Sequence, residues 1–290
     1  MQVHRFETVS ALMAVAGDFL TAKEALNNLP LGILSTFSTH PRHYPEAYFA
    51  AVLEADQVVL VALRTPPFNV VLSMSDREDA LTCLAADLSV ASPDLPGVTG
   101  PSELTYRFAE IWQAHHAVDT RLQVAERIYE LTSVHWPPEP AGSLRLATEA
   151  DWDLLLAWFT DFHTTIATAP WPPAEAARRG LDRVFGDATA AFWLWQNPHP
   201  VSVVGSAAPT GTGIRVGPVY TPPAERKHGY ASWLTAQVSQ TRLNQGYRRI
   251  FLFTDLANPT SNKIYQAIGY RPVGDAAQLV FTARSKEATA

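Results

Sequence analysis

The second half of the chain alternates apolar and polar stretches in an order that predicts its elements. Three apolar runs separated by turn residues, FWLWQ, VSVVGSAA and GIRVGPVY, predict an antiparallel series of three strands. A helix from Arg226, a strand at RRIFLFTD, a helix at NPTSNKIYQAIG and further strand sequence at YRPVG and AQLVFTA follow. Because a helix connects GIRVGPVY to RRIFLFTD, these two strands are expected to be parallel. The pattern therefore predicts an α/β (α+β) fold, a mixed sheet with helices on both faces.

The first half of the chain shows the same plan in a weaker form. Strands are expected at YFAAVLEAD, VVLVAL and FNVVLSMS, and helices at REDALTCLAADL and SELTYRFAEIWQAHHA. We interpret RLQVAERIYELTSV as a closing hairpin, and GVTGP takes the place that FLFTD has in the second half. We therefore expect an internal structural duplication, although the two halves share little sequence identity.

Between the halves, the segment HWPPEPAGS (135–143) interrupts the periodic sequence. Proline fixes φ and biases the preceding residue toward an extended conformation, so this segment is expected to be an interdomain linker. A chain of 290 residues also exceeds the usual size of one domain. We therefore predict two domains, 1–138 and 143–290.

Amino-acid composition and net charge argue against several classes of partner and location. An apolar content of 47% with 17% charged residues is typical of a soluble globular protein. A net charge of -6, with no block of like charges, argues against nucleic acid as a partner. No apolar run approaches the ~20 residues of a membrane span, and the acidic residue before the short run SALMAVAG argues against a signal peptide. A single cysteine, Cys83, excludes an internal disulfide, so we expect a cytoplasmic protein.

The stretch TPPAERKHGYASWL (221–234) carries the most specific chemistry of the sequence. It follows the strand GIRVGPVY and opens a predicted helix, whose first turn offers unpaired N–H groups and a partial positive charge. Gly229 would let an anion approach the backbone closely, and Arg226, Lys227 and His228 supply positive charge. We therefore predict a phosphate-binding site at this helix start. The fingerprints GxGxxG and GxxxxGK[ST] do not occur in the sequence.

The hexapeptide RKHGYA (226–231) resembles the signature of the GNAT superfamily of acyl-CoA N-acyltransferases. That signature has arginine or glutamine, two residues, glycine, one residue, and glycine or alanine. The downstream sequence DLANPTSNKIYQAIGYRPV resembles the asparagine, tyrosine and Gly-Tyr series of the same family. The resemblance covers nearly all of Leu144 to Phe281.

This resemblance implies a GNAT fold, in tandem with a degenerate first domain, and an acetyl-CoA-dependent N-acetyltransferase that needs no metal. The acceptor would be a primary amine, and the protein a monomer or homodimer. The first domain lacks a basic cluster with a spaced glycine, so we expect it to have lost ligand binding. The resemblance implies that Tyr265 protonates the leaving thiolate, and that the cofactor contacts are Val219, Tyr220, Thr221, Arg226, Lys227, His228, Gly229, Tyr230, Ala231, Asn258 and Asn262.

Two questions stay open at this point. Many relatives carry a glutamate on or near the fourth core strand, but GIRVGPVY has no carboxylate. The general base could be His163, Asp161 or a chain of waters. The missing carboxylate also leaves a second hypothesis, a non-catalytic module that binds acyl-CoA or regulates another protein.

Overall fold

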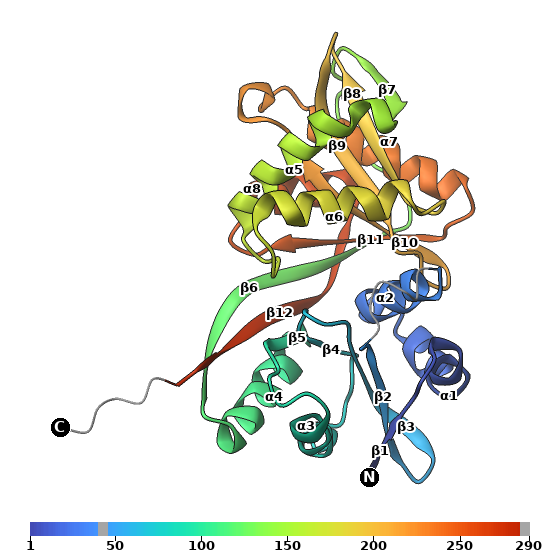
Figure 1. The fold of residues 1–290 in the computed structure, drawn as a ribbon. Helices are drawn as coiled ribbons and strands as arrows, with labels where there is room; N and C mark the ends of the chain where they lie inside the picture. Colours follow the sequence, from blue (N-terminus) through green and yellow to red (C-terminus); the bar gives the residue numbers. More distant parts are fainter. Residues whose placement is uncertain (40–45, 285–290) are drawn as a thin grey trace, which may run out of the picture. The chain divides into compact units, whose positions relative to one another are not determined.

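The computed structural model describes residues 1–39 and 46–284, and the chain divides into two compact units (Figure 1). Unit 1 contains Met1–Arg127 and the stretch that begins at Gly274, whereas unit 2 is Ile128–Val273. Both junctions lie within strands, β6 (Val118–Leu131) and β12 (Arg271–Ala283). Among the described residues, no helix is long and apolar enough to span a bilayer.

Unit 1 is a mixed sheet with two helices on each face. Strands β4 and β5 are parallel, and their other neighbours in the unit are antiparallel. One face packs against α1 (Val9–Ala22) and α2 (Asn28–Thr39), and the other against α3 (Ala80–Ala91) and α4 (Ser102–His115). The sheet order is β1 (Gln2–Arg5), β2 (Tyr48–Glu54), β3 (Gln57–Arg64), β4 (Val70–Leu72), β5 (Gly97–Pro101) and β12.

Unit 2 has the same plan. Helices α5 (Trp152–Ile166) and α6 (Pro173–Phe185) cover one face of its sheet, and α7 (Tyr230–Asn244) and α8 (Pro259–Ile268) cover the other. Strands β10 and β11 are parallel, as the connecting helix predicts. The sheet order is β7 (Ser143–Leu146), β8 (Ala191–Gln196), β9 (Pro200–Ala207), β10 (Gly213–Tyr220), β11 (Arg249–Asp255) and β6.

Strand β8 shows how the sequence pattern produces this two-sided packing. Side chains alternate between the faces of a strand, so a run without polar residues has to be covered on both sides. Phe192 and Leu194 enter the core beneath α5 and α6, while Trp193 and Trp195 enter the core beneath α7 and α8. The aromatic run FWLWQ is therefore core packing on both faces.

Each unit takes its sixth strand from the other half of the sequence. Strand β12, near the C-terminus, pairs antiparallel with β5 of unit 1, and the last residues of β6 follow β11 in unit 2. The two units therefore match strand for strand, which supports the predicted duplication.

Two details differ from the sequence-based expectations. The segment RLQVAERIYELTSV, interpreted as a hairpin, lies largely within the single strand β6, because it holds no turn residue that would reverse the chain. The predicted domains 1–138 and 143–290 also differ from the observed division, which falls at Arg127 and again at Val273. The segment 135–143 begins and ends within unit 2, where the His135 N–H donates to the carbonyl oxygen of Ile268 over 2.7 Å. The proline-rich composition of this segment indicates a break in secondary structure. It does not indicate that β6 and β12 each begin in one unit and end in the other.

Unit 1 depends closely on β12. Leu279 is buried in the core formed with α3 and α4, and Phe281 stacks on Trp112 with ring centroids 6.1 Å apart. Gly97 of β5 lies against the β12 backbone so closely that a Cβ there would overlap the carbonyl oxygen of Leu279. The pairing of β5 and β12 therefore requires glycine at this position.

We predict that Gly97→Ala lowers the free energy of unfolding by about 3 kcal/mol, because the added methyl group forces two backbones apart. Gly17→Ala is the matched control in the same unit. Gly17 lies in α1, where a Cβ would make only an ordinary contact with Met13. This control should raise stability by about 0.5 to 1 kcal/mol. Urea unfolding followed by far-UV circular dichroism measures both, and equal stability of the two variants would contradict the close approach.

Candidate functional site

The candidate site begins where β10 separates from β11. In the described part of the chain, the parallel pairing of these strands covers Gly213 to Arg215 and ends there, whereas the antiparallel pairing with β9 continues to Tyr220. A bulge between Val216 and Val219 interrupts that second ladder. Pro218, which has no N–H to donate, lies within the separated part. The side of β10 that faces β11 is thus free to bind an extended ligand through its main chain.

Helix α7 begins at the same edge of the sheet, because it follows β10 directly. Its N-cap is Gly229, with φ at +82°, and within the described residues no side chain caps the first turn. A Cβ placed on Gly229 would meet no described atom within 4 Å. The Trp233 N–H donates to the Gly229 carbonyl oxygen over 3.0 Å, which forms the first bond of the helix. The helix start therefore combines unpaired amides with open space, the features that suit an anion.

The cationic residues before the helix are exposed, and hydrogen bonds order their loop. The Arg226 Nε donates to the carbonyl oxygen of Thr221 over 3.0 Å. The His228 Nδ1 lies 3.3 Å from the carbonyl oxygen of Glu225, whose carboxylate lies 3.4 Å from the His199 Nε2. Lys227 has a φ of +69°, in the left-handed region. The loop is thus shaped before any ligand binds, which reduces the ordering cost of binding.

The next two residues of the signature offer only their main chain. Tyr230 is buried, and its hydroxyl accepts a hydrogen bond from the Asn197 Nδ2 over 2.9 Å. Ala231 is half-buried in the first turn of α7. The tyrosine side chain therefore anchors the helix start to the turn between β8 and β9.

At the end of β10, the main chain and the side chain of Tyr220 have separate roles. Its hydroxyl donates to the Asp161 carboxylate on α5 over 2.6 Å. Burial, together with this hydrogen bond, raises the pKa of Tyr220 to about 12. The Ser202 hydroxyl donates to the Tyr220 carbonyl oxygen over 3.2 Å and lies 2.8 Å from the Thr221 hydroxyl. These contacts fix the strand end and place Asp161, one of the candidate bases, beside it.

His163, the other candidate base, is half-buried on α5. Burial lowers the pKa of His163, and the positive charge of Arg183 lowers it further. Its Nδ1 is buried and has no hydrogen-bond partner among the described residues. The imidazole is therefore held in its neutral form, although no contact of His163 with the end of β10 is observed among those residues.

The two asparagines of the second motif stabilise the start of α8. The Asn258 Oδ1 caps the helix by accepting from the Ser261 N–H over 3.1 Å. The Asn262 Nδ2 donates to the carbonyl oxygens of Asn258 and Asp255 over 2.8 and 3.0 Å, and its Oδ1 accepts from the Tyr129 hydroxyl over 3.0 Å. Sequence reasoning missed Tyr129, because it lies on β6, far away along the chain, and no motif marks it.

Tyr265 lies in the core beneath α7 and α8 and is 8% exposed. Its ring lies between those of Tyr129 and Tyr270, with centroids 6.5 and 6.0 Å away. Burial raises the pKa of Tyr265 to about 12. Within the described residues its hydroxyl has no hydrogen-bond partner, whereas the Tyr270 hydroxyl lies 2.8 Å from that of Ser239. Tyr265 is therefore a protonated phenol whose O–H group donates to none of the described residues.

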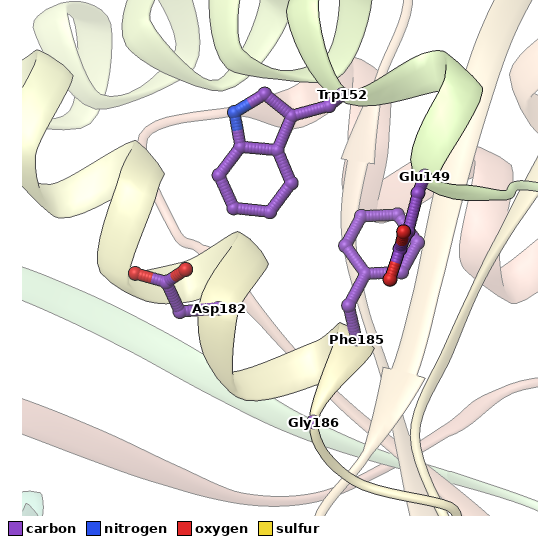
Figure 2. A pocket seen from close by; sticks show the side chains of 5 residues that line it. All are labelled: Glu149, Trp152, Asp182, Phe185 and Gly186. Atoms are coloured by element: carbon purple, nitrogen blue, oxygen red, sulfur yellow. The ribbon is translucent and has the colours of Figure 1, made fainter.

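A separate hollow of about 520 Å³ lies between the start of α5 and the end of α6 (Figure 2). Trp152 begins α5, nine residues before Asp161, so the hollow is distant along the helix from the end of β10. The hollow is lined by Glu149, Trp152, Asp182, Phe185 and Gly186.

Among the described residues, no group of three His, Cys, Asp or Glu side chains could hold a metal ion.

Comparisons with known proteins concern the family of unit 2 and the fold of the chain. Residues 152–270 match the acetyltransferase (GNAT) family. No curated protein sequence matches the chain. A solved structure of a Drosophila protein covers 98% of this chain and 99% of its own, with 11% identity and a TM-score of 0.67. The structure of a tandem GNAT protein from the clavulanic acid biosynthesis pathway aligns with 99% of this chain and over 100% of its own length, with 12% identity and a TM-score of 0.59.

A third similar structure, an acetyltransferase of the GNAT family from Colwellia psychrerythraea, covers 97% of this chain and 99% of its own, with 11% identity and a TM-score of 0.56. At such identities the likeness concerns the fold, and that fold extends over both units. The sequence match lies entirely within unit 2, the unit that holds the separated strands and the open helix start. Residues 152–270 of the chain thus form an acetyltransferase (GNAT) domain.

Proposed function

We propose that the protein transfers the acetyl group of acetyl-CoA to a primary amine of a small molecule. The observation that carries this proposal is the arrangement at one edge of unit 2. There the pairing of β10 with β11 ends after Arg215, and α7 starts with an uncapped glycine. An extended amide-containing arm and a pyrophosphate are the two parts of acetyl-CoA that these features suit.

The residues present fit this ligand. The amides from Arg226 to Ala231 would hold the pyrophosphate, with Arg226, Lys227 and His228 supplying charge around it. The main chain of Val219, Tyr220 and Thr221 would pair with the pantetheine arm. Asn258 and Asn262 would keep the start of α8 in place beside it. The open space at Gly229 supports this assignment, because a side chain there would occupy the cradle.

When bound, acetyl-CoA supplies the thioester carbonyl carbon to which the amine adds. The Tyr220 amide would donate to the oxygen of that carbonyl as negative charge develops. Tyr265 would give its proton to the sulfur as the carbon–sulfur bond breaks. With a pKa near 12, the phenol keeps that proton at neutral pH. The new nitrogen–carbon bond yields an amide.

An ammonium ion cannot attack, so the amine has to lose a proton first. We propose Asp161 as the group that accepts it, directly or through water, because its carboxylate is bonded to the hydroxyl of Tyr220, the last residue of β10. Asp161 also supplies a carboxylate that the strand itself lacks. A negative charge at this place would in addition attract a cationic acceptor.

Unit 1 offers no comparable place for acetyl-CoA in the residues described. Beyond β4, the Met74 N–H donates to the Asn27 Oδ1 over 2.7 Å, while the Ser73 N–H continues the pairing with β3 by donating to the Val61 carbonyl oxygen over 2.9 Å. Arg77, which precedes α3, is bound by the carboxylates of Glu54 and Asp79. The strand end is occupied and the cation neutralised, so we propose that only unit 2 binds acetyl-CoA.

We predict that the full chain binds one acetyl-CoA and that Gly229→Glu weakens this binding by more than ~2 kcal/mol, because a carboxylate would enter the anion cradle. Isothermal titration calorimetry measures affinity and stoichiometry together. The matched control is Gly229→Ala, which imposes the same backbone strain without a charge and should bind within about fivefold of wild type.

Two results of that titration would contradict the assignment. Unchanged affinity in a folded Gly229→Glu variant would remove the helix start from the site. A stoichiometry of two would show that unit 1 also binds. The full chain is required for this experiment, since unit 1 takes β12 from the C-terminal end of the sequence.

We predict that Tyr265→Phe lowers kcat by roughly ten- to a thousandfold while the affinity for acetyl-CoA stays within about threefold, because a proton donor acts chiefly in the transition state. Release of free thiol from acetyl-CoA, measured with a panel of primary amines, gives the rates.

Tyr270→Phe is the matched control for Tyr265→Phe. It removes a buried phenol of the same core whose hydroxyl lies against Ser239, so it should reduce stability and leave kcat within about threefold. Equal effects of the two variants on kcat would argue against Tyr265 as the acid. Tight binding of acetyl-CoA without thiol release for any amine would instead favour a non-catalytic module.

A further inference from the structure

Trp136 is the most unusual tryptophan of the chain. Of the eight tryptophans, it is the only exposed one, with 50% of its surface accessible. It lies in the proline-rich segment that precedes β7, and Pro137 and Pro138 follow it directly. Proline restricts the backbone, so the indole is held out to solvent by a stiff segment. The indole therefore offers a large aromatic surface to solvent at a fixed position.

Contacts on both sides fix this position. On one side, the His135 N–H donates to the carbonyl oxygen of Ile268, the last residue of α8. On the other, the Ala141 carbonyl oxygen accepts from the Trp195 Nε1 over 3.1 Å. The segment therefore runs from the end of α8 to β8, and Trp136 lies between these two attachments.

Between them, the Trp136 ring packs on Trp233, with centroids 5.2 Å apart. Trp233 belongs to the first turn of α7, since its N–H donates to Gly229. Helical side chains tilt toward the N-terminus of their helix, and Trp233 is one turn after Gly229, so Trp136 packs against the first turn of α7. The Trp233 Nε1 has no hydrogen-bond partner among the described residues, so ring packing alone joins the two indoles. One face or edge of Trp136 remains available to a planar ligand.

We propose that Trp136 is a stacking platform for the adenine of acetyl-CoA. This inference rests on the proposed function, which places the pyrophosphate at Gly229. The adenine is joined to that pyrophosphate through a single ribose, so a base-stacking surface has to lie near the start of α7. An exposed and pre-ordered indole meets that requirement, because every purine has a π-face and an indole is a large aromatic surface.

The test uses the full chain and three probes in calorimetry: acetyl-CoA, 3′,5′-ADP, and S-acetyl-4′-phosphopantetheine, which lacks the adenosine. Trp136→Ala should weaken binding of acetyl-CoA and of 3′,5′-ADP by about tenfold. It should leave binding of S-acetyl-4′-phosphopantetheine within about twofold. Trp136→Phe keeps an aromatic face and should retain most of the affinity. Leu146→Ala, which truncates another exposed apolar residue of unit 2, should change none of the three.

The outcomes separate this inference from the proposed function. If the wild-type protein binds acetyl-CoA and Trp136→Ala binds it equally well, the stacking role is wrong and the proposed function stands. If Trp136→Ala loses affinity for all three probes alike, the residue supports the fold rather than the adenine, and the inference is again overturned. If the wild-type protein binds neither acetyl-CoA nor the shortened thioester, the proposed function fails and the inference fails with it.

Discussion

The separation of β10 from β11 is the constraint on which the rest of the site depends. Two parallel strands that part after Arg215 leave main-chain groups of β10 without ladder partners on one side. Such groups are costly to bury unless a ligand or water pairs with them. The helix that follows β10 begins at the same edge, so the proposed anion site and the proposed main-chain site both depend on a single strand–helix connection. The strand's antiparallel pairing with β9, which reaches Tyr220, keeps the separated end in place.

Unit 1 has a similar separation, because the parallel pairing of β4 with β5 ends after Val71. Beyond that point the Asn27 side chain accepts a hydrogen bond from the Met74 N–H. The helix that follows has an aspartate before it in place of an uncapped glycine. The difference between the units is therefore local, a few hydrogen bonds and one helix start, while the sheet order and the covering helices are alike. Two units can thus share an architecture while differing in the local groups on which ligand binding depends.

The sequence predicted the elements of unit 2 well, because each of its strands and helices has a clear period and is bounded by turn residues. It predicted a helix after the proline-rich turn, because these features are local, but placed its start at Arg226, whereas α7 begins at Tyr230 after the left-handed Gly229. It did not predict that β6 and β12 would cross between the units, because strand pairing depends on contacts between residues distant along the chain. The bond from Tyr129 to Asn262 and that from Tyr220 to Asp161 are of the same kind.

Two buried tyrosines, Tyr265 in α8 and Tyr270 just after it, differ in the hydrogen bonding of their hydroxyls. Tyr270 pairs its hydroxyl with Ser239, which compensates the cost of burying a polar group. Tyr265 lies in the same core, is 8% exposed and lacks such a partner among the described residues. Phenylalanine would fill that position without the cost of an unpaired hydroxyl. A hydroxyl there can serve an acceptor from outside the protein, and in the proposed function that acceptor is the leaving thiolate.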